Sequence, residues 1–141
     1  MDIFDFVCKH DVDFAAYLPS KGLVNQIENT IGVKIGDQLK QYLLEYGYLG
    51  FESIEFYGAN EKQGLSSDIV KQTIYLHNYY SITNDYIAFE NCGECDYALV
   101  DSFDRVYIYQ TEDNKLTITN KTLFKYILSR FNSELKYFSK E

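Results

Sequence analysis

The stretch that decides the fold is Tyr86–Asp104, YIAFENCGECDYALVDSFD, followed directly by RVYIYQTED at 105–113. Its short apolar runs are rich in Tyr, Ile, Val and Phe, the residues that suit a half-buried pleated surface. The breaks between these runs hold Asn, Gly, Asp and Ser, which favour turns. The segment therefore predicts three short strands joined by two tight turns.

Helical periodicity flanks this segment on both sides. Apolar residues recur every three or four positions in stretches that begin with a capping side chain or end in glycine. These stretches predict helices near Ile3–Lys9, from Ser20 to Ile31 before Gly32, from Asp37 to Gly47, from Ser67 or Asp68 to about Asn78, and after an N-cap at Asn120. The buried side of the last helix is predicted to consist of Leu123, Phe124, Ile127, Leu128 and Phe131.

Two further stretches, YLGFESIEFYG at 48–58 and KLTIT at 115–119, have strand-like composition, and GANEKQGLSS at 58–67 is predicted to be a loop. The resulting order of helices, strands, helix, strands and helix predicts an α+β domain with a mostly antiparallel sheet covered by helices. Residues 1–19 are interpreted as an N-terminal extension and residues 20–141 as the folded domain.

Length and composition favour one well-packed acidic domain. The chain has 141 residues, of which 46% are hydrophobic, which is enough for one core and argues against disorder. Its net charge of −8 disfavours free nucleic-acid binding, because nucleic-acid binders are normally basic. An acidic protein can still approach the positive cleft of a nucleic-acid enzyme.

The sequence gives no sign of membrane insertion or secretion. No run approaches the roughly 20 apolar residues of a membrane span, and the start MDIFDF lacks the basic region of a signal peptide. The three cysteines, Cys8, Cys92 and Cys95, are an odd and low count that argues for a reducing compartment. A cytoplasmic protein is therefore expected.

Charge is distributed unevenly along the chain. Between Gln72 and Asp104 there is no lysine or arginine, and the acidic residues there are Asp85, Glu90, Glu94, Asp96, Asp101 and Asp104. These carboxylates could simply fill turns, where Asp in particular bonds to nearby backbone. The alternative is an acidic face that binds a basic partner.

The pair in Cys92-Gly-Glu-Cys95 is the sharpest chemical motif. A redox CxxC normally opens a helix, which lowers the thiol pKa, whereas here a strand is predicted to follow. A zinc site needs four ligands, and only Cys8, His10 and His77 remain to supply them. Ordinary turn thiols are the favoured interpretation, and neither histidine is expected to be catalytic.

Tyr107 and Tyr109 would share one face of a strand, with Val106 and Ile108 on the other. If Val106 and Ile108 are in the core, both tyrosines point outward beside the acidic turns, as a partner-binding surface would require. The alternative is ordinary packing of the tyrosines under a helix.

A series of segments, in this order and at this spacing, resembles the SMI1/KNR4, or SUKH, superfamily over about residues 20–131. Within the first segment, Glu28, Gly32 and Gly47 match positions typical of that family. The segments are IENTIGVKIGDQLKQYLLEYGYLGF (27–51), IEFYG (54–58), SDIVKQT (67–73), NDYIAFEN (84–91), GECDYALVD (93–101), VYIY (106–109) and TLFKYIL (122–128).

This resemblance implies a single SUKH-like domain with a binding role and no catalysis. Bacterial members resemble immunity proteins, which bind a cognate toxin of a polymorphic or contact-dependent system, often a nuclease, and block it. The hypothesis is a cytoplasmic immunity protein without a cofactor that occludes the active site of a basic protein toxin. The expected toxin-binding residues are Glu90, Glu94, Asp96, Asp101, Asp104, Tyr107 and Tyr109.

Two alternatives stay open. One is a general protein–protein adaptor of the same family. The other is a thiol or zinc protein that uses Cys92 and Cys95.

Overall fold

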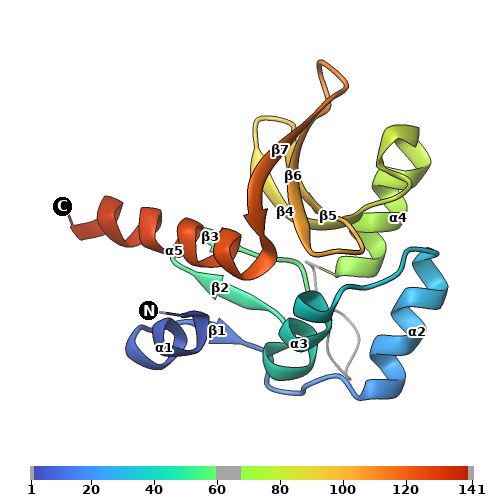
Figure 1. Cartoon of the computed structure of the whole chain (residues 1–141). Helices are drawn as coiled ribbons and strands as arrows, with labels where there is room; N and C mark the ends of the chain where they lie inside the picture. The colour runs from blue at the N-terminus through green and yellow to red at the C-terminus, as the bar shows by residue number, and fades with distance from the viewer. Residues whose placement is uncertain (1, 60–67, 140–141) are drawn as a thin grey trace.

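The computed structural model describes residues 2–59 and 68–139 (Figure 1). Its helices are α1 (Ile3–Lys9), α2 (Lys21–Ile31), α3 (Asp37–Tyr46), α4 (Ile69–Tyr79), the short 3₁₀ turn η1 (Ser81–Thr83) and α5 (Leu123–Ser139). Its strands are β1 (Asp13–Phe14), β2 (Leu49–Phe51), β3 (Ile54–Glu55), β4 (Ile87–Gly93), β5 (Asp96–Val100), β6 (Arg105–Gln110) and β7 (Lys115–Thr122). The predicted α+β class is confirmed. None of the described helices is long and apolar enough to cross a membrane.

The larger sheet is an antiparallel meander of β4, β5, β6 and β7 in chain order. Residues 86–113 supply its first three strands, with Tyr97 opposite Tyr109 and Val100 opposite Val106. The smaller sheet, β1-β2-β3, continues into the larger one through a bridge between Phe56 and Glu90. α4 lies on one side of the larger sheet and α5 on the other (Figure 1).

The two N-caps predicted for α2 and α4 follow local capping rules. The Ser20 hydroxyl accepts a hydrogen bond from the backbone N–H of Leu23 and caps α2, which ends at Gly32 with a left-handed φ of 73°. Asp68 caps α4 through the N–H groups of Val70 and Lys71. Both caps confirm predictions, whereas the alternative cap at Ser67 and most of the predicted loop at 58–67 lie outside the described residues.

The predicted N-cap at Asn120 is wrong. β7 continues through Asn120 to Thr122, and α5 begins at Leu123. The first turn of α5 is capped from a distance instead, because the side chain of Gln38 accepts a hydrogen bond from the N–H of Phe124 at 2.9 Å. Of the predicted buried side, Leu123, Ile127 and Phe131 are buried, while Phe124 and Leu128 are partly buried and pack against the core. Tyr126 also belongs to the buried side.

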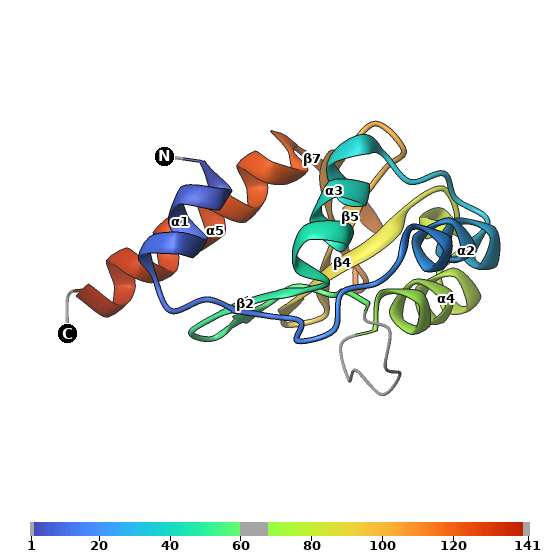
Figure 2. The same ribbon diagram turned by 90° about the horizontal axis from the view of Figure 1, so that it is seen from below.

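The N-terminal segment contributes to the core. Phe6 of α1 is fully buried, and its ring lies 5.2 Å from the ring of Phe131 in α5. α1 therefore packs alongside α5 (Figure 2). Phe51 contacts both of these rings and joins the small sheet to the cluster. The boundary between an extension and the domain at residue 20 stays a prediction, although Ile3, Phe6 and Val12 belong to the core.

The β4–β5 hairpin predicts a stabilising substitution. Its two turn residues, Glu94 and Cys95, have φ of 53° and 68°, so the turn resembles type I′, which favours Asn-Gly. Cys95→Gly should raise the free energy of unfolding by about 1 kcal/mol, because glycine adopts a left-handed φ without the Cβ clash. Urea unfolding would measure this gain. Cys95→Ala removes the same thiol and keeps the clash, so an equal gain in that variant would contradict the explanation.

Candidate functional site

The structure divides the predicted site residues into two groups. Glu90, Asp101, Asp104 and Tyr109 are buried, and each is engaged within the protein. Glu94 is exposed, while Asp96 and Tyr107 are partly buried. The acidic zone read from the sequence is therefore only partly a surface.

Glu90 joins the sheet to α5. It is 2% exposed, and its carboxylate accepts hydrogen bonds from the Tyr126 hydroxyl at 2.6 Å and from the Arg130 guanidinium at 2.6–3.2 Å. Hydrogen bonding to Glu90 raises the pKa of Arg130, and burial, followed by the charge of Glu90, raises the pKa of Tyr126. The carboxylate thus balances a charge inside the fold.

Asp101 closes the β5–β6 turn. One carboxylate oxygen accepts from the backbone N–H groups of Phe103 and Arg105, both at 2.9 Å, which confirms the predicted Asx-type turn. The other oxygen accepts from the Arg105 guanidinium at 2.7 Å and from the Tyr107 hydroxyl at 3.1 Å. Burial raises the pKa of Asp101, but the hydrogen bonds from Arg105, Phe103 and Tyr107 outweigh it and hold the pKa below its ordinary value.

This lowered pKa predicts a pH dependence of stability. A carboxyl with a lowered folded-state pKa stabilises the fold above the ordinary aspartate pKa of about 3.9, and this contribution is lost as the pH falls through the lowered value. Asp101→Asn should therefore lose less stability than the wild type between about pH 7 and about pH 3. Urea midpoints at both pH values would measure the difference. Asp85→Asn, a control at an exposed acid, should follow the wild type, and an Asp101→Asn variant that also follows it would exclude Asp101 as the source.

Asp104 is a long-range cap. Its carboxylate oxygens accept hydrogen bonds from the backbone N–H groups of Gln38 and Leu39, both at 3.0 Å, at the N-terminus of α3. The local N-cap position of α3 is Gly36, which offers no side chain. A Cβ on Gly36 would lie 2.5 Å from an Asp104 oxygen, so glycine is what lets the carboxylate approach.

The prediction that both tyrosines point outward is wrong for Tyr109. Tyr109 is 0% exposed, and its ring lies 5.5 Å from that of Tyr80, just after α4. The alternative prediction, that the tyrosine packs under a helix, is correct for Tyr109. Tyr107 lies nearer the rim, where its ring contacts that of Tyr86 at 5.1 Å.

Four carboxylates gather at one end of the larger sheet. Glu94 and Asp96 lie at the β4–β5 turn, and Glu112 and Asp113 lie at the β6–β7 turn. The two turns are held together because Thr111 donates hydrogen bonds from its hydroxyl and its N–H to the Cys95 carbonyl, at 2.8 and 3.2 Å. Both turns point the same way at the top of Figure 1. We call these four residues the acidic hairpin end.

The acidic hairpin end carries net negative charge at the surface. Glu94, Glu112 and Asp113 are exposed, and Lys115, opposite Gln110, is a basic neighbour. Sequence reasoning found Glu94 and Asp96 but missed Glu112 and Asp113. The adjacent acids Glu112 and Asp113, in the turn after β6, could have indicated this. They were missed because the stretch without lysine or arginine ends at Arg105, before them.

The cysteines do not form a reactive pair. Cys92 lies 3.7 Å from the Tyr126 hydroxyl, and burial of its sulfur, followed by the charge of Glu90, raises the pKa of the thiol to about 11. A thiol with a raised pKa is a poor nucleophile at neutral pH. In the described part of the chain, no three His, Cys, Asp or Glu side chains are grouped to hold a metal ion. His77 bonds to the Tyr86 carbonyl, and His10 packs on Phe6.

These features define a small α+β domain with four carboxylates at one end of its larger sheet. The family model described as SMI1-KNR4 cell-wall, SUKH_5, matches residues 9–132, most of the chain. The protein therefore belongs to the SMI1-KNR4 (SUKH) family, which confirms the resemblance seen in the sequence. A search of curated proteins finds no match to the chain.

Proposed function

We propose that this protein is an immunity protein that binds one basic toxin and occludes its active site. Membership of the SUKH family supports a binding role without catalysis. The observation that carries the proposal is the acidic hairpin end, in which two neighbouring hairpin turns bring four carboxylates to one end of the larger sheet. A nuclease toxin fits this surface, because a cleft that binds phosphates is positively charged.

The surface and the core have separate tasks in this proposal. Glu94, Asp96, Glu112 and Asp113 attract the toxin and orient it. Glu90, Asp101 and Asp104 hold the sheet, the turn and α3 in place. Of the two predicted aromatic contacts, Tyr107 and Tyr109, Tyr107 stays partly accessible.

Capture of the partner tests the proposal. The tagged protein would be incubated with lysate of the source cells, washed at moderate salt and analysed by mass spectrometry. One stoichiometric basic protein that is toxic when expressed alone supports the immunity role. Many substoichiometric partners would support the adaptor alternative instead, and a purified protein that contains zinc would support the metal alternative.

Charge reversal at the hairpin end should slow association with the captured partner. We expect Glu94→Lys/Glu112→Lys/Asp113→Lys to lower the association rate constant about tenfold or more and to weaken its salt dependence, because exposed charges steer encounter. Surface plasmon resonance at two salt concentrations would measure both.

The control is Asp11→Lys/Asp13→Lys/Asp85→Lys, which reverses three exposed acids elsewhere and gives the same net charge. If the two variants slow association equally, the overall charge and not the hairpin end guides binding. Unchanged association in the hairpin variant would remove this surface from the mechanism.

A further inference from the structure

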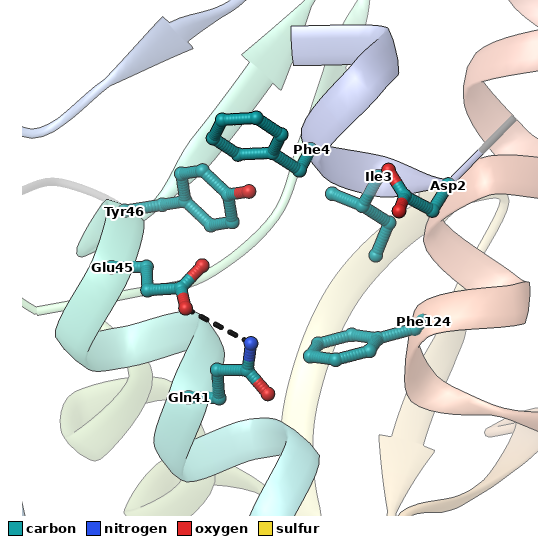
Figure 3. Close-up of a pocket in the computed structure, with 7 residues that line it drawn as sticks. All are labelled: Asp2, Ile3, Phe4, Gln41, Glu45, Tyr46 and Phe124. Carbon is teal, nitrogen blue, oxygen red and sulfur yellow. Dashed lines mark hydrogen bonds between the residues drawn. The ribbon is translucent and has the colours of Figure 1, made fainter.

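A pocket lies between α1, α3 and the start of α5 (Figure 3). Its volume is about 120 Å³. Apolar cavities of roughly 150 Å³ hold a benzene ring, so this pocket has room for one side-chain head group. Its apolar walls include Phe4, Tyr46 and Phe124.

Two carboxylates accompany these rings. Asp2 and Glu45 lie on different sides of the pocket in Figure 3, and no lysine or arginine is among the described residues that line it. Asp2 accepts a hydrogen bond from the N–H of Asp5 at 2.8 Å, and Glu45 accepts one from Gln41 at 2.9 Å. Each bond lies within the carboxylate's own helix or its cap, so both acids are held in place.

The pKa of Tyr46 is raised by burial and by the negative charges around this pocket. Burial, followed by the negative charge of Glu45, raises the pKa of its hydroxyl to about 12, and Cys8 and Asp2 add to the effect. The Tyr46 hydroxyl therefore stays protonated at neutral pH. Negative potential and aromatic faces occur together here, which is the combination that attracts a planar cation.

We propose that this pocket binds the guanidinium of an arginine side chain presented by a partner protein. Arginine stacks on aromatic faces and forms planar hydrogen bonds to carboxylates, so it uses both features of the pocket. Phe4 is 63% exposed and is available to stack on the ligand. The inference rests on the proposed function, since it adds a second contact for the same basic partner.

The pocket can be tested without the partner. N-acetyl-arginine amide would be titrated into the labelled protein and followed by NMR, with N-acetyl-citrulline amide as the neutral isostere. Arginine should shift the signals of Ile3, Glu45 and Phe124, and citrulline should bind at least about tenfold more weakly, because it lacks the charge. Equal binding of citrulline, or of N-acetyl-norleucine amide, would overturn the proposal and assign the pocket to a neutral or apolar occupant.

Two variants locate the binding. Asp2→Asn/Glu45→Gln should weaken arginine binding about tenfold, and asparagine still caps α1. The matched control, Asp13→Asn/Asp85→Asn, removes the same charge at two exposed acids outside both the pocket and the hairpin end, and it should leave arginine binding unchanged. Phe4→Ala should also weaken binding, without loss of fold because the ring is largely exposed. Arginine binding that the control weakens as much as Asp2→Asn/Glu45→Gln does would overturn the proposal.

The two proposals fail separately. Capture of a toxic partner with no arginine shift in the pocket would reject the pocket and keep the immunity role. Arginine binding in the pocket with no toxic partner would reject the immunity role and keep the site.

Discussion

Replacing Arg130 by methionine is expected to lower the free energy of unfolding by about 3–5 kcal/mol, the cost of leaving a buried charge without its partner. Glu90, the charge left behind, is 2% exposed and would keep only the Tyr126 hydroxyl from its present set of side-chain donors. Denaturant unfolding at neutral pH would measure the loss.

Two further variants separate the buried pair from a general effect of removing arginine. Arg105→Met is the matched control, because Arg105 also bonds to a buried carboxylate and its side chain is 54% exposed, against 36% for Arg130. Without the guanidinium, Asp101 still accepts hydrogen bonds from the backbone N–H groups of residues 103 and 105 and from the Tyr107 hydroxyl. Its loss should cost no more than about 1 kcal/mol. Adding Glu90→Gln to Arg130→Met removes the unpaired buried carboxylate, so the double variant should recover part of the lost free energy of unfolding. Equal costs for the two arginines, together with no recovery, would contradict the role given to Glu90.

Asp104→Ala should cost about 2–4 kcal/mol, because it leaves the first N–H groups of α3 without an acceptor. The N–H of Leu39 is buried at this point, so water does not readily replace the carboxylate. The comparison is Asp68→Ala at the local cap of α4, which should cost about 1 kcal/mol. Thermal and urea unfolding of both variants would measure the two losses.

Gly36 provides an independent test of the same contact. Gly36→Ala should destabilise the wild type, since its Cβ would collide with the Asp104 carboxylate. In the Asp104→Ala background the collision is absent, so the added methyl should cost much less. Additive losses in the double variant would contradict the proposed contact.

The sequence predicted those parts of the fold that depend on neighbours along the chain. Ser20 and Asp68 cap the starts of α2 and α4, and Gly32 caps the end of α2, where local capping rules place them. The three central strands follow from alternating composition and turn residues. The prediction at Asn120 was wrong because asparagine is a frequent N-cap, whereas the acceptor for the first turn of α5 is Gln38, 86 positions before Phe124 in the chain.

The candidate site was harder to predict, because the role of a carboxylate depends on what faces it in three dimensions. Glu90, Asp104 and Glu94 look alike in sequence, but Glu90 faces Arg130, Asp104 faces α3, and Glu94 faces outward. The sequence also cannot show that Thr111 bonds to Cys95, which brings the β6–β7 turn beside the β4–β5 turn.

Growth of a host that expresses the captured partner tests the central claim most directly. The partner alone should stop growth, the wild-type protein co-expressed with it should restore growth, and the hairpin variant Glu94→Lys/Glu112→Lys/Asp113→Lys should restore it less well than Asp11→Lys/Asp13→Lys/Asp85→Lys. A partner that does not impair growth, or an impairment that the wild-type protein does not relieve, would contradict the immunity function.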